Sequence, residues 1–190
     1  MDPGPPGRMA LNDGPRVALS EGVIPAPEEE VVFVTADMLA EQPFLEGLTE
    51  HQLARLTPLT SRTMFHAGNR IFRQGTPADQ FWLITDGSVY LDSEVPGYDN
   101  FVLETLRSGS VLGWSWLFPP YRWHFGAVAV TTTHAITFNG ALVRALCQQD
   151  PAFGYELNSR FLRVMGERLQ SARRRLEDCQ RQLGHHHDEL

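Results

Sequence analysis

The sequence predicts an α+β fold, in which an antiparallel, jelly-roll-like β-roll is flanked by N-terminal helices and a long C-terminal dimerisation helix. Three observations predict this fold. Short β-rich segments separated by turn residues follow one another from Leu59 to about Asn139. Helical patterning precedes them over residues 35–56 and returns at Ala141–Gln149. Leucines then recur every seven residues from Leu162, as in a coiled coil.

Composition limits the classes of function. A chain of 190 residues suits one domain with short extensions. Its formal net charge of −7 argues against a nucleic-acid surface over most of the chain. All 16 basic residues are arginine, which excludes lysine Schiff-base and P-loop lysine chemistry. Because the sequence also contains no catalytic motif, we do not expect an enzyme.

The cysteines and the apolar segments indicate the compartment. Cys147 and Cys179 are far apart, so they form neither a disulfide framework nor a zinc spacing. The N-terminus does not have the pattern of a signal peptide, and no apolar run is long enough to span a membrane. We therefore expect a cytoplasmic protein that does not enter membranes.

The N-terminal part divides into an arm and two helices. Residues 1–34 are rich in Pro, Gly, Ala and acidic residues over most of their length, and they predict a disordered arm. Residues 35–150 form the predicted domain. Thr49 to Gln52 fits a capping box at the start of the second helix, and Pro58 stops that helix.

Turn residues divide the β-rich region into strands. Asp86-Gly87 predicts a hairpin between the strands Phe81–Thr85 and Ser88–Leu91, since both residues tolerate positive φ. Pro96–Asn100 predicts a second hairpin, between Ser88–Glu94 and Phe101–Arg107.

Asp150-Pro151 opens the long helix, which we expect over residues 151–183, followed by a flexible tail over 184–190. Leu162, Leu169, Leu176 and Leu183 lie on one stripe of this helix. The stripe could pack along the helix's own domain. A repeat over three heptads favours a partner helix instead, and with it a parallel homodimer.

The region is similar to a known family. His66-Ala-Gly68, Arg73-Gln-Gly75, Ala78-Asp79, Phe81–Ile84 and Asp86-Gly87 resemble, in that order, the cyclic nucleotide-binding domain of the Crp/Fnr type. The resemblance covers about residues 37–180. It implies a β-roll that senses a ligand, with a phosphate-binding cassette that runs from a Gly-Glu pair through a short helix to an Arg-Ser/Thr-Ala run.

The cassette departs from that pattern at its charged positions. Gly113 and Ala127 match, but Trp114 stands at the glutamate position, Phe125 at the arginine position and Gly126 at the serine or threonine position. Neither charged group that would hold a cyclic nucleotide is in place. We therefore expect cAMP or cGMP to bind weakly or not at all.

Nearby side chains offer alternatives to the missing groups. Arg122 and His124 could bind an anion or could be solvated loop residues. The aromatic cluster around Trp114 and Trp116 could line a stacking pocket or fill a degenerate one. The predicted ligand-binding residues are Gly113, Trp114, Ser115, Trp116, Arg122, His124, Phe125, Gly126 and Ala127.

Two charged segments have less specific interpretations. Arg173–Arg175 could touch nucleic acid, although the exposed face of a coiled coil explains them. His185–His187 with Asp188 could ligate a metal, but a mobile tail explains them better, and we expect no metal site. After the long helix only Gly184–Leu190 remain, so we expect an effector domain without a helix-turn-helix and without specific DNA binding.

These observations lead to two hypotheses. The first is a regulatory ligand-sensing module that acts through protein partners rather than DNA. The alternative is a structural or adaptor protein with a degenerate, aromatic-filled pocket that no longer binds cyclic nucleotide.

Overall fold

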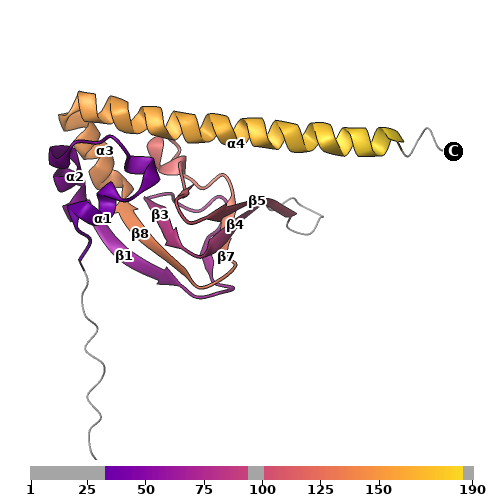
Figure 1. Cartoon of the computed structure of the whole chain (residues 1–190), viewed down its shortest axis with the longest axis horizontal. Coiled ribbons are helices and arrows are strands. Elements are labelled where there is room, and N and C mark those ends of the chain that lie inside the picture. Colours follow the sequence, from indigo (N-terminus) through magenta and orange to yellow (C-terminus); the bar gives the residue numbers. More distant parts are fainter. Residues whose placement is uncertain (1–32, 94–100, 186–190) are drawn as a thin grey trace, which may run out of the picture. The chain divides into compact units, whose positions relative to one another are not determined.

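The computed structural model describes residues 33–93 and 101–185. It confirms the predicted fold class, since short helices and two antiparallel sheets precede one long helix (Figure 1). The helices are α1 (Ala36–Ala40), η1 (Pro43–Leu45), α2 (Glu50–Leu56), η2 (Thr57–Leu59), η3 (Ser115–Leu117), α3 (Gly140–Gln149) and α4 (Pro151–His185). The strands are β1 (Thr60–Phe65), β2 (Arg70–Phe72), β3 (Gln80–Asp86), β4 (Ser88–Ser93), β5 (Phe101–Arg107), β6 (Val111–Leu112), β7 (Gly126–Ala129) and β8 (Thr133–Asn139).

The strands form two four-stranded sheets, in the orders β1-β8-β3-β6 and β2-β7-β4-β5. This topology corrects the hairpin predicted at Asp86-Gly87, because β3 and β4 belong to different sheets and do not pair. Gly87 has a φ of 87° and turns the chain from one sheet into the other. The local sequence therefore predicts the position of the turn correctly. Contacts with strands far away in the sequence determine which strands pair with β3 and β4. The second predicted pair, β4 with β5, is confirmed, and its turn lies outside the described residues.

The short N-terminal helices form as predicted. The Thr49 side chain accepts from the Gln52 amide, and the Gln52 side chain accepts from the Thr49 amide, which completes the capping box of α2. The predicted arm extends too far at its end, because Val34 is buried in the core and belongs to the domain. The rest of that arm, residues 1–32, lies outside the described residues.

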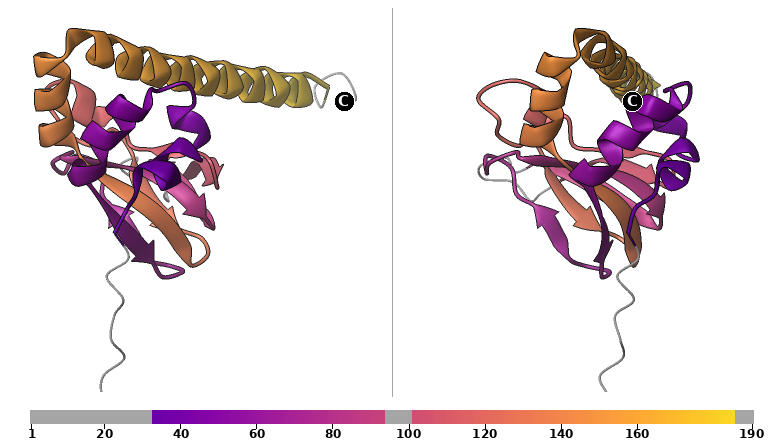
Figure 2. Two further views of the ribbon diagram at one scale, coloured as in Figure 1. Left: turned by 60° about the vertical axis from the view of Figure 1, so that its left-hand side comes forward. Right: turned by 90° about the vertical axis from the view of Figure 1, so that its left-hand side faces the viewer.

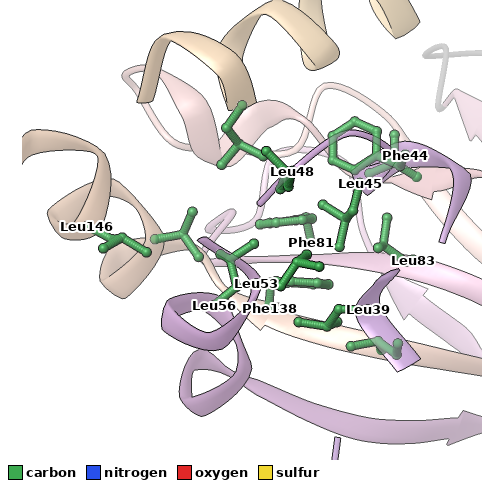
Figure 3. Packing of buried hydrophobic residues seen from close by; sticks show 14 of the residues in the cluster. Leu39, Phe44, Leu45, Leu48, Leu53, Leu56, Phe81, Leu83, Phe138 and Leu146 are labelled. Carbon is green, nitrogen blue, oxygen red and sulfur yellow. The ribbon is translucent and has the colours of Figure 1, made fainter. Parts of the chain in front are cut away.

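Two clusters of buried side chains form the core. The first lies among the helices and the sheet that contains β3 and β8, where Leu53 and Leu56 lie beside Phe138 and Leu146 lies at the edge of the cluster (Figure 3). The second lies between the two sheets, around Trp82 and Trp123. Figure 2 shows α1, α2 and α3 gathered at one end of the sheets, next to the start of α4. One group of aromatic side chains is thus buried under the short helices, and another is buried between the two sheets.

Helix α4 begins where predicted. Asp150 accepts from the Phe153 amide at 3.0 Å, so it caps the helix, and Pro151 occupies the first turn. The helix continues to His185, two residues past the predicted end. Phe153, Leu157 and Phe161 are buried against the domain, whereas most later residues are exposed. Within the described residues, no helix combines the length and the apolarity needed to cross a membrane.

Candidate functional site

The candidate cassette is an ordered loop between β6 and β7. Gly113 leaves β6 with a φ of 86°, a conformation that favours glycine, and η3 follows it. The loop returns along the turn at residues 75–78 through three backbone hydrogen bonds. They join the Gly75 amide to the Trp123 carbonyl, the Trp123 amide to the Thr76 carbonyl, and the Ala78 amide to the Tyr121 carbonyl. The cassette is thus tied to the opposite turn by main-chain contacts.

The mouth of the cassette is aromatic. The ring of half-buried Trp114 stacks on the His124 ring, with 4.7 Å between centroids, and lies 5.6 Å from the Phe118 ring. The Ser115 side chain is buried, and its Oγ lies 2.9 Å from His124 Nδ1. This hydrogen bond and the stacking orient the exposed imidazole against the indole. The mouth therefore offers an indole ring and an imidazole ring for stacking. The family's pattern has a carboxylate and a guanidinium in this cassette instead.

Arginines support the loop instead of pointing into an anion site. Arg122 donates to the Gly75 carbonyl at 2.7 Å. Arg144, from α3, donates to the Trp116 carbonyl and lies over the Tyr121 ring, 4.3 Å from its centroid. Arg144 is not among the predicted site residues, because nothing in the local sequence of α3 links it to a loop more than twenty residues earlier. Its cation–π contact holds the cassette against α3.

The structure separates the predicted site residues into two groups. Gly113, Trp114, Ser115, Arg122 and His124 come together at the cassette. Trp116 does not join them, since its side chain is fully buried and stacks on Phe81 at 4.7 Å in the helical core. In this segment, large side chains point alternately toward the surface and toward the core. The site that we propose therefore does not include Trp116.

Near the end of the cassette, position 126 has no room for a side chain. Gly126 and Ala127 are buried in β7, and Phe125 is half-buried. A Cβ on Gly126 would clash with Oδ1 of Asp92, which is paired with Arg70 at 2.7 Å. Since Asp92 is only 2% exposed, this ion pair occupies the space where a serine or threonine side chain would stand.

The space between the sheets is filled by aromatic rings. Trp123 is 4% exposed, stacks on Phe72 with centroids 4.0 Å apart, and lies 5.8 Å from the Trp82 ring. A Cβ on Gly113 would meet the Trp123 ring at 2.8 Å, so the indole packs directly under the start of the cassette. Trp123 belongs to the aromatic run that begins at Trp114, but it is not among the predicted ligand-binding residues. The position of Trp123 between Arg122 and His124 could have indicated its burial. Alternate residues of an extended segment face opposite sides, so Trp123 faces inward and the other two face outward.

The comparisons with known proteins identify the class of this domain. Residues 62–150 match the family model of the cyclic nucleotide-binding domain. A CRP-like cAMP-activated global transcriptional regulator from Mycobacterium tuberculosis is 23% identical over 142 residues, which cover 75% of this chain and 62% of the regulator. The chain thus spans less than two thirds of the length of the regulators that it matches.

Solved structures show the same fold. A cyclic nucleotide-binding protein from Geobacter metallireducens superposes with a TM-score of 0.66 at 24% identity, over 72% of this chain and 99% of that one. The catabolite activator protein of Thermus thermophilus superposes with a TM-score of 0.58 at 23% identity, over 73% and 63% of the two chains.

Residues 62–150 therefore resemble cyclic nucleotide-binding domains in sequence, and the chain shares their β-roll fold. The relatives that it resembles include a regulator of the Crp type. Among the described residues, no three His, Cys, Asp or Glu side chains gather where they could hold a metal ion.

Proposed function

We propose that this protein is a regulatory ligand-sensing module that works as a homodimer and acts on a protein partner rather than on DNA. One observation carries the proposal. The cassette keeps its ordered, main-chain-tied geometry, while its mouth presents the stacked rings of Trp114 and His124 in place of charged groups. A loop with this construction suits a flat ligand of low charge, which can stack on an indole.

The exposed stripe of α4 supports the homodimer. Leu162, Leu169 and Leu176 are 66%, 71% and 61% exposed, so the stripe does not pack along the helix's own domain. Tyr155 lies one heptad earlier on the same stripe and is 73% exposed. Side chains of this size are seldom left in water in a continuous row, and a second copy of α4 would bury them in a parallel seam.

An adaptor without a ligand is the second candidate. The stack of Phe72, Trp82 and Trp123 favours it, because these rings already fill the interior of the roll. In that case the aromatic residues stabilise the domain, and the surface of the domain alone carries the interaction with the partner.

Calorimetry with cAMP and cGMP tests the ligand. We expect weak binding or none, with dissociation constants in the high micromolar range or above. Loss of the arginine contact alone removes about 1.5–3 kcal/mol, which is one to two decades of affinity. Submicromolar binding would contradict this expectation, and abolition of that binding by Arg122→Ala would assign the phosphate to Arg122.

A thermal-shift screen of planar aromatic compounds separates the two candidates, since a ligand of the native state raises its stability. A compound whose effect disappears in Trp114→Ala but persists in Phe118→Ala supports the sensor. A panel without any response supports the adaptor.

The cellular setting follows from composition. The two cysteines suggest no disulfide framework, and Cys147 is a free thiol, which suits a reducing compartment such as the cytoplasm. The homologous regulators give no reason to assign an enzymatic activity to the domain, and we propose none.

A further inference from the structure

A cleft of about 670 Å³ lies between α4 and the roll, away from the cassette. One wall is α4 from Arg160 to Ser171, and the other walls are η1, β5 and the turn that leads into β6. We propose that this cleft binds a small molecule through an oxyanion, a phosphate or carboxylate group held by the arginines of α4. This inference does not depend on the function proposed for the cassette, because no residue from 113 to 127 lines the cleft.

Arg168 is one of two largely buried arginines in the cleft. Its side chain is 16% exposed, and it donates to the Val111 carbonyl. Its Nε lies 3.5 Å from Oε2 of Glu104. Burial lowers the pKa of Arg168 more than the nearby Glu104 carboxylate raises it. The guanidinium is therefore a desolvated cation with incomplete compensation, which a further anion would stabilise.

Two more guanidinium groups face the same cleft. Arg160 is 11% exposed, reaches the Phe44 carbonyl at 3.4 Å, and has a buried Nε without a hydrogen-bond partner among the described residues. Arg163, one turn further along α4, is exposed, and within residues 33–93 and 101–185 it has no hydrogen bond or ion pair. Guanidinium groups with donors in reserve suit the geometry of phosphate and carboxylate oxygens.

Three carboxylates, those of Glu46, Glu104 and Glu167, line the cleft beside the three arginines. Glu104 pairs with Arg168, and exposed Glu156 lies 3.9 Å from Arg160. Glu46 and Glu167 are exposed, so water and salt screen their charges. We expect an entering anion to interact more strongly with the buried guanidinium groups than with these screened carboxylates.

Occupation of the cleft would tie α4 to the roll. Beyond Val164 the helix is held mainly by polar contacts, in which Arg168 donates to the Val111 carbonyl and Arg175 to the Leu103 carbonyl. A bridging anion adds a contact between the helix and the turn before β6. The ligand would thus control how firmly the helix that carries the leucine stripe is docked.

Thermal unfolding and calorimetry of the full chain test the proposal with three salts at equal ionic strength: potassium phosphate, potassium succinate and potassium chloride. We expect phosphate or succinate to raise the melting temperature above its value in chloride, and the more effective salt identifies the oxyanion. Hydrogen exchange of residues 160–175 should slow in that salt.

Matched variants locate the anion. Arg163→Gln should weaken its binding about tenfold or more without changing the melting temperature in chloride, since Arg163 is exposed. Arg173→Gln, on the same helix but outside the cleft, should keep the full response. Equal stabilisation in all three salts, or an unchanged response in Arg163→Gln, would overturn the proposal. Loss of the response in Arg122→Gln would place the anion in the cassette and would also overturn it.

Discussion

Gly87 and Gly75 have similar backbone conformations in different surroundings. Their φ values are 87° and 77°, both in the left-handed region. A Cβ on Gly87 would lie 2.5 Å from the Thr132 carbonyl oxygen, whereas a Cβ on Gly75 would meet nothing within 4 Å. Gly87 therefore serves two purposes, the turn between the sheets and the close approach of another chain segment.

The two glycines make a matched pair for mutation. We expect Gly75→Ala to lower the free energy of unfolding by about 1–2 kcal/mol, from backbone conformation alone. Gly87→Ala should lower it further, because the segment at Thr132 and Thr133 must also move. Urea denaturation measures both losses. Equal losses would show that the close contact at Gly87 costs nothing.

At the scale of elements, Asp150 joins α2 to α4. Its carboxylate accepts from the Phe153 amide and lies 2.6 Å from Arg55 Nη1. The Phe153 hydrogen bond, chiefly, and the charge of Arg55 hold the pKa of Asp150 below its ordinary value, against a smaller effect of desolvation. The ionised carboxylate therefore stabilises the folded state at neutral pH. That stabilisation is lost as the pH falls through the lowered pKa.

Asp150→Asn tests this linkage, because asparagine keeps a helix cap and removes the charge. We expect the variant to be less stable than the natural protein at pH 7. The difference should shrink in an acidic buffer well below the ordinary pKa of an aspartate, because this stabilisation is lost as the pH falls through the lowered pKa of Asp150. Urea denaturation at the two pH values measures it. A difference that is the same at both would mean that the charge contributes nothing.

The exposed stripe of α4 yields the second prediction at this scale. If the proposed homodimer forms, Leu169→Glu should convert it into a monomer, since the substitution places two unpaired charges in an apolar seam. Each leucine removed from water contributes roughly 1.5–3 kcal/mol. Gln170→Glu adds the same charge one residue off the stripe and should leave the dimer intact. Light scattering distinguishes the two, and a dimer that persists in Leu169→Glu would refute the seam.

At the scale of the whole molecule, the distribution of charge affects whether the protein can bind DNA. The net charge is −7, and the basic residues of α4 are largely engaged within the chain. Arg168 and Arg175 donate to carbonyls of the roll, and Arg173 pairs with Glu177 at 2.8 Å. The overall negative charge therefore opposes the approach of this chain to the phosphates of a duplex.

We therefore expect this chain to select no motif from a pool of randomised duplexes at physiological salt. A retardation assay followed by sequencing of the retained fraction measures this. Enrichment of a defined palindrome would contradict the expectation, since a symmetric dimer that reads DNA selects two related half-sites.

Several features were predictable because they depend on residues close together in sequence. The capping box at Thr49, the start of α4 at Pro151 and the turn at Gly87 each follow from local backbone chemistry. The heptad spacing placed Leu169 and its neighbours on one face, and the structure leaves that face exposed. The departures of the cassette from the family's charged positions were also visible in the sequence alone.

Other features were decided only by contacts between distant segments. Asp86-Gly87 looked like a hairpin, but β3 pairs with β8 and β6, and β4 pairs with β5 and β7. Trp116 and Trp123 lie seven residues apart in one aromatic run, yet one packs on Phe81 in the helical core and the other on Phe72 between the sheets. Sequence by itself determined which residues are apolar and where the chain turns. Only tertiary structure decided which sheet or core receives each of them, because burial depends on surfaces supplied by segments far away along the chain.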